Sequence, residues 1–275
     1  MKQVYKIGHS DDLNPSQAVL LIEVAETHCC FAIVDYANFI MVQFGYYVLD
    51  ENDNGDILKV VIDEHSELRQ AFRQTVVSYY TNENVFIPSK FYRYEETQKL
   101  LQSIYEKTQN IVITESIPEW QLYNVYHVPA VTHGLLSRRF ATGNFWHAYS
   151  IILKNHLAPN TGGNLLIDFK TERFTMVAAR DSSLLLAQIF PYSNAADVLY
   201  WLLKTCKELS LSQNDVKLTL SGLVDKRSSV LTGLHQYFIN LEFAGVENEI
   251  QLSRDFEDYP VHFFSSLYKL ATCVS

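Results

Sequence analysis

Apolar and polar positions repeat in the same order over two distant stretches of the chain. The first stretch, Leu20 to Val48, reads LLIEVAETHCCFAIVDYANFIMVQFGYYV, and the second, Leu165 to Ser193, reads LLIDFKTERFTMVAARDSSLLLAQIFPYS. Each contains apolar runs separated by short polar turns, a pattern typical of three antiparallel strands. An acid, Glu23 or Asp168, ends the first run of each stretch. The pattern therefore predicts two copies of one β-meander.

Helical spacing of apolar residues follows each meander. Segment 66–80, SELRQAFRQTVVSYY, places apolar residues on one helical face, and segment 194–210, NAADVLYWLLKTCKELS, does the same behind an N-cap at Asn194. The later elements expected are a strand at 84–89, a helix around 95–107, a strand and a helix across 120–140, a strand at 216–222, a helix at 228–240, and a last strand and helix across 248–273. The chain thus repeats the order β-β-β-α-β-α-β-α, which predicts an internal duplication.

This order of elements predicts a particular fold. Three strands joined by tight turns form an antiparallel meander, and strands reached through helices join the same sheet in parallel by right-handed crossovers. The product is a mixed α/β unit of the ribonuclease-H-like kind. We predict two such halves in tandem, residues 1–160 and 161–275, joined at the segment APNTGGN (158–164), where Gly162 and Gly163 form a flexible joint.

Two tandem ribonuclease-H-like halves resemble the actin-like ATPase fold, which is shared by actin, sugar kinases, the seventy-kilodalton heat-shock chaperones and the cytoplasmic pilus-assembly and type II secretion proteins. With no large insertion expected, the chain looks closest to an uncharacterised bacterial family of this fold from Bacteroidetes, whose function is not assigned. The resemblance implies a cleft between two lobes that holds ATP and magnesium. In active members, turns of the type D-x-G-x-T supply a carboxylate for hydrated magnesium, a glycine backbone that approaches phosphate, and a hydroxyl donor.

The first turn of this chain keeps only part of that motif. Glu23 supplies a carboxylate and Thr27 a hydroxyl, but Ala25 stands at the glycine position. Glu26 adds a negative charge close to where the phosphates of a nucleotide would lie. The backbone of this turn is therefore not expected to cradle phosphate in the usual way.

The second turn departs further from the motif. Asp168 fits it, yet Lys170 replaces the glycine and Glu172 replaces the hydroxyl residue, although Lys170 can touch phosphate as a point charge. The glycine pair that contacts adenosine late in the second half is also missing. The sequence thus favours a degenerate nucleotide cleft without a cofactor or metal, in which Glu23 and Asp168 are ordinary exposed acids at strand ends. The alternative is a divergent ATP-dependent kinase or ATPase that holds magnesium with these two acids.

Composition and charge exclude several other classes of protein. The chain of 275 residues has a formal net charge of −9 at pH 7, which argues against a nucleic-acid binder because such proteins need a basic face. A ribonuclease-H-type nuclease needs clustered carboxylates within one half, and nothing in the sequence shows that Glu23 and Asp35 converge. No apolar run is long enough to span a membrane and the N-terminus is polar, so we expect a cytoplasmic protein. The four cysteines are expected to be buried thiols, and no pair of histidines has the spacing of a zinc site.

A surplus of aromatic residues points to protein binding. The chain contains 17 Tyr and 16 Phe, and tyrosines beyond the needs of two cores suit protein interfaces. The segment around Arg93 combines Phe91, Tyr92 and Tyr94, and we predict it as an interaction site. We therefore expect a non-catalytic interaction or scaffold protein whose partner is another protein or a second copy of this chain.

Overall fold

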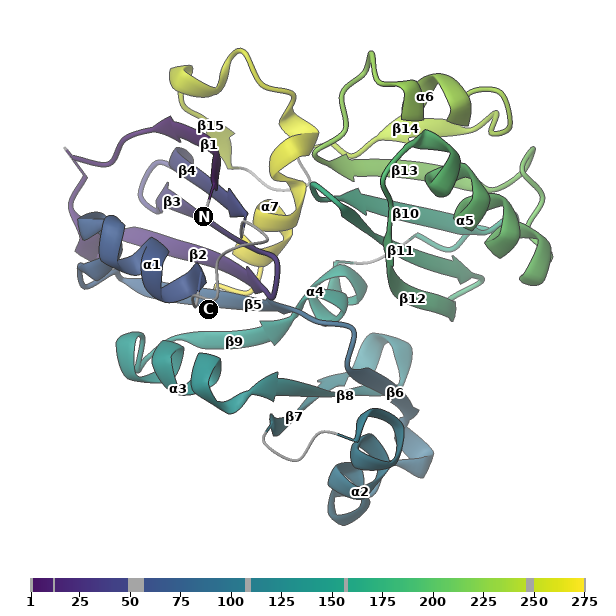
Figure 1. The fold of residues 1–275 in the computed structure, drawn as a ribbon, viewed down its shortest axis with the longest axis horizontal. Helices are drawn as coiled ribbons and strands as arrows, with labels where there is room; N and C mark the ends of the chain where they lie inside the picture. The colour runs from purple at the N-terminus through teal and green to yellow at the C-terminus, as the bar shows by residue number, and fades with distance from the viewer. Residues whose placement is uncertain are drawn as a thin grey trace. The chain divides into compact units, whose positions relative to one another are not determined.

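The computed structural model describes residues 2–11, 13–48, 57–106, 110–155, 158–245 and 250–274. The chain divides into two compact units (Figure 1). The first unit comprises Met1–Lys154, Asn248–Asp258 and Leu267–Ser275, and the second comprises Asn155–Glu247 and Tyr259–Ser266. Each unit is built on a mixed β-sheet, and each is described by itself below.

The sheet of the first unit has the strand order β1-β4-β3-β2-β5-β9, with β15 pairing to β4. Its strands are β1 (Lys2–Gly8), β2 (Ala18–Ala25), β3 (His28–Asp35), β4 (Ile40–Val48), β5 (Gln74–Tyr80), β9 (Asn144–His147) and β15 (Gln251–Leu252). The helices of this unit outside the insertion described below are α1 (Ile57–Glu64), α3 (Ala130–Arg139), α4 (Ala148–Lys154) and the part of α7 (Ser265–Ala271) that begins at Leu267. Strands β2, β3 and β4 form the predicted antiparallel meander, and β5 and β9 continue the sheet in parallel.

The sheet of the second unit has the order β12-β11-β10-β13-β14. Its strands are β10 (Asn164–Phe169), β11 (Arg173–Arg180), β12 (Ser183–Pro191), β13 (Lys217–Gly222) and β14 (Leu241–Phe243), and its helices are α5 (Ala195–Glu208) and α6 (Ser229–Leu234). Asn194 caps α5 as predicted, in a reciprocal capping box with Asp197. Apart from β1 and β15, which extend the first sheet beyond β4, the order β4-β3-β2-β5-β9 corresponds strand for strand to β12-β11-β10-β13-β14, so the predicted repetition of one mixed-sheet topology is confirmed.

The first hairpin of each unit shows the repetition at the level of single residues. Strand β11 begins and ends 145 residues after β3, since its bounds are 173–180 against 28–35. The pairing also repeats, because Val24 opposes Cys29 as Phe169 opposes Phe174. The next pairing, of β3 with β4 and of β11 with β12, contains a register shift at the same place in both units, which is the signature of a β-bulge.

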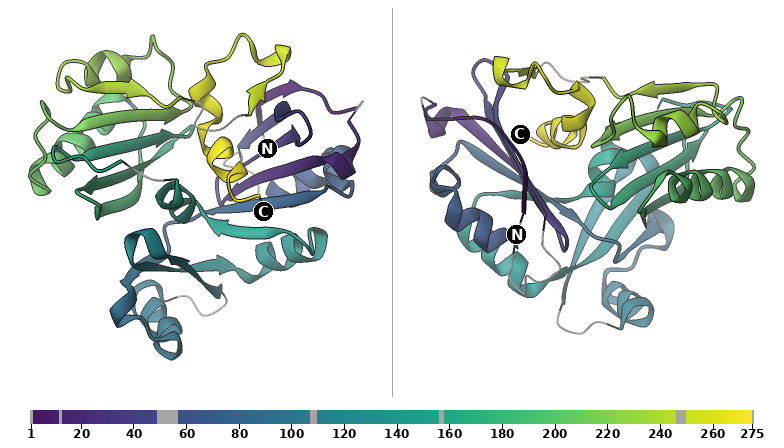
Figure 2. Two further views of the ribbon diagram at one scale, coloured as in Figure 1. Left: turned by 180° about the vertical axis from the view of Figure 1, so that it is seen from behind. Right: turned by 45° about the horizontal axis from the view of Figure 1, so that its top comes forward.

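A separate three-stranded sheet is inserted in the first unit between β5 and α3. Its order is β6-β8-β7, with β6 (Asn84–Pro88), β7 (Asn110–Ile117), β8 (Leu122–Pro129) and the helix α2 (Tyr94–Tyr105). We call residues 84–129 the insertion; it extends from the β9 side of the larger sheet (Figure 2). The expectation of a chain without a large insertion is therefore wrong. The strand expected at 84–89 exists, but it belongs to this sheet instead of the main one.

The helix expected over residues 66–80 is also wrong. This segment contains a short 3-10 helix, Ser66–Arg69, followed by β5. Six consecutive residues of β5, Thr75 to Tyr80, are buried, because β5 lies in the interior of a sheet that is covered on both faces. Such a strand lacks alternation, and a continuous apolar run does not distinguish a buried strand from a helix.

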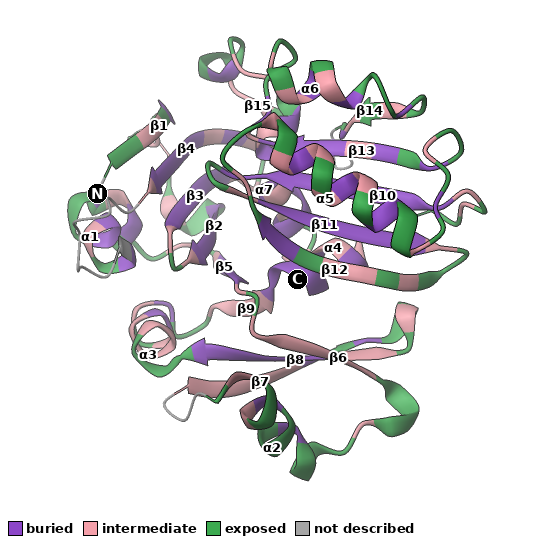
Figure 3. Cartoon of the chain, turned by 45° about the vertical axis from the view of Figure 1, so that its right-hand side comes forward, coloured by how far each residue is buried: buried purple, intermediate pink, exposed green. Residues whose placement is uncertain are grey.

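Both sheets are the centres of hydrophobic cores. In the first unit, one face of the meander packs against α1 and α3 through residues such as Leu58, Val61 and Leu136. In the second unit, α5 and α6 cover one face through residues such as Leu202 and Leu231, and β10, β11 and β13 are buried over most of their length (Figure 3). The segment 158–163 is a turn in which Gly163 N–H donates to Asn160 O, so it is not an open linker. No helix in the described part of the chain is long and apolar enough to cross a membrane.

Candidate functional site

The acid of the first turn, Glu23 on β2, is buried, with an exposed fraction of 3%. Its Oε1 lies 3.1 Å from Nε2 of His28 and 3.8 Å from Sγ of Cys30, both on β3. The His28 ring stacks on Tyr46 and meets Tyr80 edge-on. The expectation that Glu23 is an exposed strand-end acid is therefore wrong: its carboxylate is held inside the unit by hydrogen bonding.

The acid of the second turn, Asp168 on β10, is also buried, with an exposed fraction of 5%. Its Oδ1 accepts a hydrogen bond of 2.7 Å from the hydroxyl of Ser221 on the neighbouring strand β13. Its Oδ2 lies 3.2 Å from Nζ of Lys170, which is itself 4% exposed and donates to Ser266 Oγ at 3.2 Å. Lys170 therefore neutralises Asp168 within the unit, and the expectation of an exposed acid is wrong here too.

The backbone of the second turn is closed by its own hydrogen bonds. The N–H of Lys170 donates to Arg173 O at 2.8 Å, and the hydroxyl of Tyr192 donates to Lys170 O at 2.7 Å. In a phosphate-binding turn, such N–H groups point at the ligand instead. Glu172 is exposed on this turn, and Thr27 on the first turn is half-buried.

The two acids occupy equivalent places in their units. Glu23 opposes Ser78 on the parallel strand β5, and Asp168 opposes Ser221 on β13. The partners differ: His28 comes from the second strand of the meander, whereas Lys170 comes from the turn. His28 lies just beyond the five residues of the first D-x-G-x-T pattern and Lys170 stands at the glycine position of the second, so a search for that motif does not find the pairing. Among the described residues, no group of three or more His, Cys, Asp or Glu side chains is placed to hold a metal ion.

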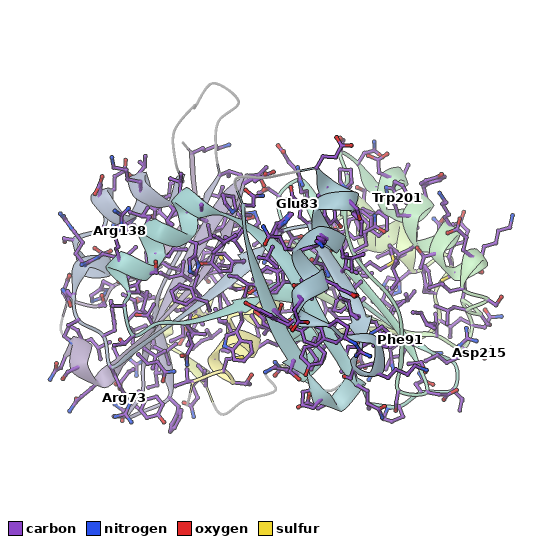
Figure 4. All side chains as sticks on the ribbon, turned by 90° about the horizontal axis from the view of Figure 1, so that it is seen from below. Arg73, Glu83, Phe91, Arg138, Trp201 and Asp215 are labelled. Carbon is purple, nitrogen blue, oxygen red and sulfur yellow. The ribbon has the colours of Figure 1, made fainter. Side chains whose placement is uncertain are left out.

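The predicted interaction segment lies on the insertion, where it connects β6 to α2. Phe91, which is labelled in Figure 4, and Tyr94 are exposed, by 64% and 74%. Tyr92 is half-buried and stacks on Tyr123 of β8, with ring centroids 3.8 Å apart. The structure thus separates the three aromatic residues into two exposed rings and one that anchors the segment to the sheet.

A buried polar network that was not predicted from the sequence joins the insertion to the main sheet. Glu115 on β7 accepts hydrogen bonds through Oε1 from the hydroxyl of Tyr126 and, at 2.8 Å, from the backbone N–H of His147 on β9. Burial raises the pKa of Glu115 to about 7, and these hydrogen bonds offset only part of that rise. An acid inside the apolar strand NIVITESI is the signal that was available in the sequence.

His147 is neutral in this network. Its Nδ1 accepts from the N–H of Tyr149 at 3.0 Å, so Nε2 carries the proton and donates to Thr81 O at 3.1 Å. Complete burial lowers the pKa of His147 to about 3. Nearby, Asn124 of β8 donates to Ser150 of α4 at 3.0 Å. The insertion is therefore attached to β9 and α4 by buried polar contacts as well as by apolar packing.

The sheet orders of the two units define a protein of the actin-like ATPase fold. A Bacteroides thetaiotaomicron protein described as having an actin-like ATPase fold and unknown function is similar to the chain, with a TM-score of 0.71 and 17% identity over 88% of this chain and 96% of that one. A chain of a PilM–PilN type IV pilus biogenesis complex is similar with a TM-score of 0.57 and 13% identity, over 92% and 97%. No curated protein sequence matches. Residues 9–241 match the family described as "Protein of unknown function (DUF3822)", and the chain belongs to that family.

Proposed function

We propose that this protein is a non-catalytic interaction module, active in the cytoplasm, in which the nucleotide-binding turns of the actin-like fold have lost their function. The observation that carries the proposal is the buried pair Asp168–Lys170. An aspartate at this place in an active turn holds hydrated magnesium, whereas this one is neutralised by a lysine of its own turn. His28 engages the corresponding acid Glu23 in the first unit.

Likeness of fold supports a protein partner only by analogy. The similar chain from the PilM–PilN complex is described as part of an assembly of two proteins, and fold alone does not carry function from one protein to another. The exposed Phe91 and Tyr94 supply an independent reason, because exposed aromatic rings frequently anchor protein interfaces. We propose that the partner is another protein or a second copy of this chain.

Binding of ATP and magnesium is expected to be weaker than micromolar. The motif's backbone donors are lost at both turns, and each charge-assisted hydrogen bond lost costs about 1.5–3 kcal/mol. Titration calorimetry with ATP and magnesium measures the affinity. A micromolar isotherm that disappears in the isosteric variants Glu23→Gln and Asp168→Asn would instead establish the alternative function, a divergent ATP-dependent kinase or ATPase.

Replacing Phe91 and Tyr94 together by serine is expected to reduce partner capture by about tenfold or more, because exposed aromatic anchors dominate interface energies. The fold should be unaffected, since both rings are mostly exposed and such substitutions usually change stability by less than about 0.5 kcal/mol. Quantitative affinity capture from the native host measures the change. The matched control is Ile239→Ser, which removes an apolar side chain that is 72% exposed on the second unit. Equal capture by both variants would contradict this interaction site.

A further inference from the structure

The first unit contains a groove of about 620 Å³, and none of its lining residues belongs to the turns that follow Glu23 and Asp168. We call it the β7–β9 groove, and it is lined by Ile111, Val112, Ile113, His133, Gly143, Asn144, Phe145, Trp146 and Cys273. Its volume is within the range of sites for small ligands, so the volume alone does not identify an occupant. The chemistry and the geometry of the lining residues indicate which kind of occupant fits.

The groove runs along the edges of two strands. It is lined by three consecutive residues of β7, from Ile111 to Ile113, and by Asn144 to Trp146 of β9. Successive side chains of a strand point to opposite faces of the sheet, so consecutive residues line one groove only where the groove follows the edge of the strand. In the described part of the chain, β7 ends the order of the inserted sheet and β9 ends that of the main sheet.

The edges of β7 and β9 are joined at one end of the groove. They meet where the backbone N–H of His147 donates to the Glu115 carboxylate at 2.8 Å. That bond shows that the N–H of His147 points away from β5. Because these directions alternate along a strand that pairs in parallel, the N–H and C=O of Phe145 also point away from β5, toward the groove. The β9 wall of the groove thus presents main-chain hydrogen-bonding groups.

The charge of the lining restricts the occupant further. Among the nine lining residues there is no Asp, Glu, Lys or Arg. His133 is the one titratable base among them; its Nδ1 lies 2.7 Å from the Tyr79 hydroxyl, and burial lowers its pKa, so it is neutral at pH 7. The protein as a whole has a net charge of −9. A charged side chain in this groove would lose water and find no opposite charge among the lining residues; Lys154, outside the lining, already lies over the Trp146 ring with Nζ 3.7 Å from its centroid. An apolar, uncharged side chain matches the isoleucine, phenylalanine and tryptophan walls.

We propose that the β7–β9 groove takes an extended, uncharged, apolar segment of a partner protein as an added β-strand. Strand addition satisfies the main-chain groups of the open edge, and the side chains of alternate residues would contact the two walls. This inference rests on the proposed function, because it gives the interaction module a second binding surface, separate from Phe91 and Tyr94.

The test is selection from a displayed library of linear peptides of about seven residues, which is long enough to follow either edge. The enriched peptides are expected to be uncharged at their centre and to alternate apolar with small polar residues. Methylation of alternate backbone nitrogens in a selected peptide should weaken binding by about tenfold or more, because it removes main-chain donors that strand addition needs. This arm requires no change in the protein.

Two variants locate the site. Val112→Arg places a charge on the groove wall and is expected to weaken binding of the selected peptides by about tenfold or more. The Phe91→Ser/Tyr94→Ser variant should bind them normally. Occupancy should also slow alkylation of Cys273, a half-buried thiol of the lining, whereas Cys29, Cys30 and Cys206 are fully buried. Burial raises the pKa of the Cys273 thiol, so alkylation is run at mildly alkaline pH.

Each other outcome overturns the inference. Peptides that bind Val112→Arg normally but fail on the Phe91→Ser/Tyr94→Ser variant would leave the proposed function standing and remove the groove from it. A charged consensus, or binding that tolerates backbone methylation, would exclude strand addition. Self-association that is measured by sedimentation and abolished by Val112→Arg would assign the groove to a second copy of the chain. No enrichment, together with no partner captured by the unmodified protein, would remove both proposals.

Discussion

Replacing Lys170 by methionine is expected to lower the free energy of unfolding of the second unit by about 3–5 kcal/mol. Lys170 Nζ lies 3.2 Å from Asp168 Oδ2, and both side chains are almost fully buried. Methionine retains most of the apolar stem but leaves the Asp168 carboxylate buried without its counter-charge. Amide hydrogen exchange over β10 and β13 measures the loss, because it reports opening of the second unit separately from the first.

Two further variants show that the effect comes from the buried charge. Lys204→Met removes an exposed lysine of α5 whose Nζ lies 3.9 Å from Glu208, and an exposed pair of this kind contributes about 0.3–0.5 kcal/mol. The double variant Asp168→Asn/Lys170→Met removes both charges and should be more stable than Lys170→Met alone. Similar losses for Lys170→Met and Lys204→Met would contradict the view that the pair is buried and replaces a ligand cation.

Replacing Glu115 by glutamine is expected to stabilise the first unit at neutral and alkaline pH but not in acid. Burial raises the pKa of Glu115 from its usual value near 4.5 to about 7. Below pH 4.5 the carboxyl group is neutral in both the folded and unfolded states, so glutamine gains little there. As the pH rises from 4.5 to 7, the carboxyl group ionises in the unfolded state but stays neutral in the folded state. The free energy of unfolding of the wild type therefore falls by about 3 kcal/mol relative to that of the variant. Urea unfolding between pH 4 and 8, monitored through amide hydrogen exchange in β7, measures the difference.

Glu67 provides a control of opposite sign in the same unit. Burial alone would raise its pKa, but hydrogen bonds from His65, its own backbone and Gln43 outweigh burial and lower it. A lowered pKa contributes stability above the unfolded value that is lost as the pH falls. Glu67→Gln should therefore destabilise at pH 7 and lose this effect in acid. A Glu115→Gln variant with the same pH dependence as Glu67→Gln would show that the Glu115 carboxyl is not kept neutral by burial.

The duplicated meander could be predicted from the sequence because its determinants are local. Short apolar runs and tight turns define each strand, and the hairpins they form pair residues that are close in the chain. The repeat at an offset of 145 therefore carries over to the bounds of β3 and β11 and to the pairing of the first hairpin. The N-cap at Asn194 was predictable for the same reason.

Predictions failed where burial on both sides removed the periodic signal. Strand β5 is buried on both faces and was expected to be a helix. Strand β6 and helix α2 of the insertion were predicted at about the right residues, but β6 was assigned to the main sheet and α2 to the helices that cover it. Sequence patterns give the type of an element, but the choice between two sheets depends on long-range pairing, such as that between Asn84 and Tyr126.

The sequence by itself determined that this protein has two mixed-sheet units with an acid near the end of the same strand in each, because the strands and turns of each meander follow from local patterns. Only the tertiary structure decided the state of those acids. The counter-charge of Asp168 comes from Lys170, two residues further along the chain. Its buried hydrogen-bond donor, Ser221, comes from β13, 53 residues away. Likewise, Glu115 meets the amide of His147 across 32 residues of chain. Burial and partner choice depend on which strands lie next to each other, and that is set by packing of the whole unit.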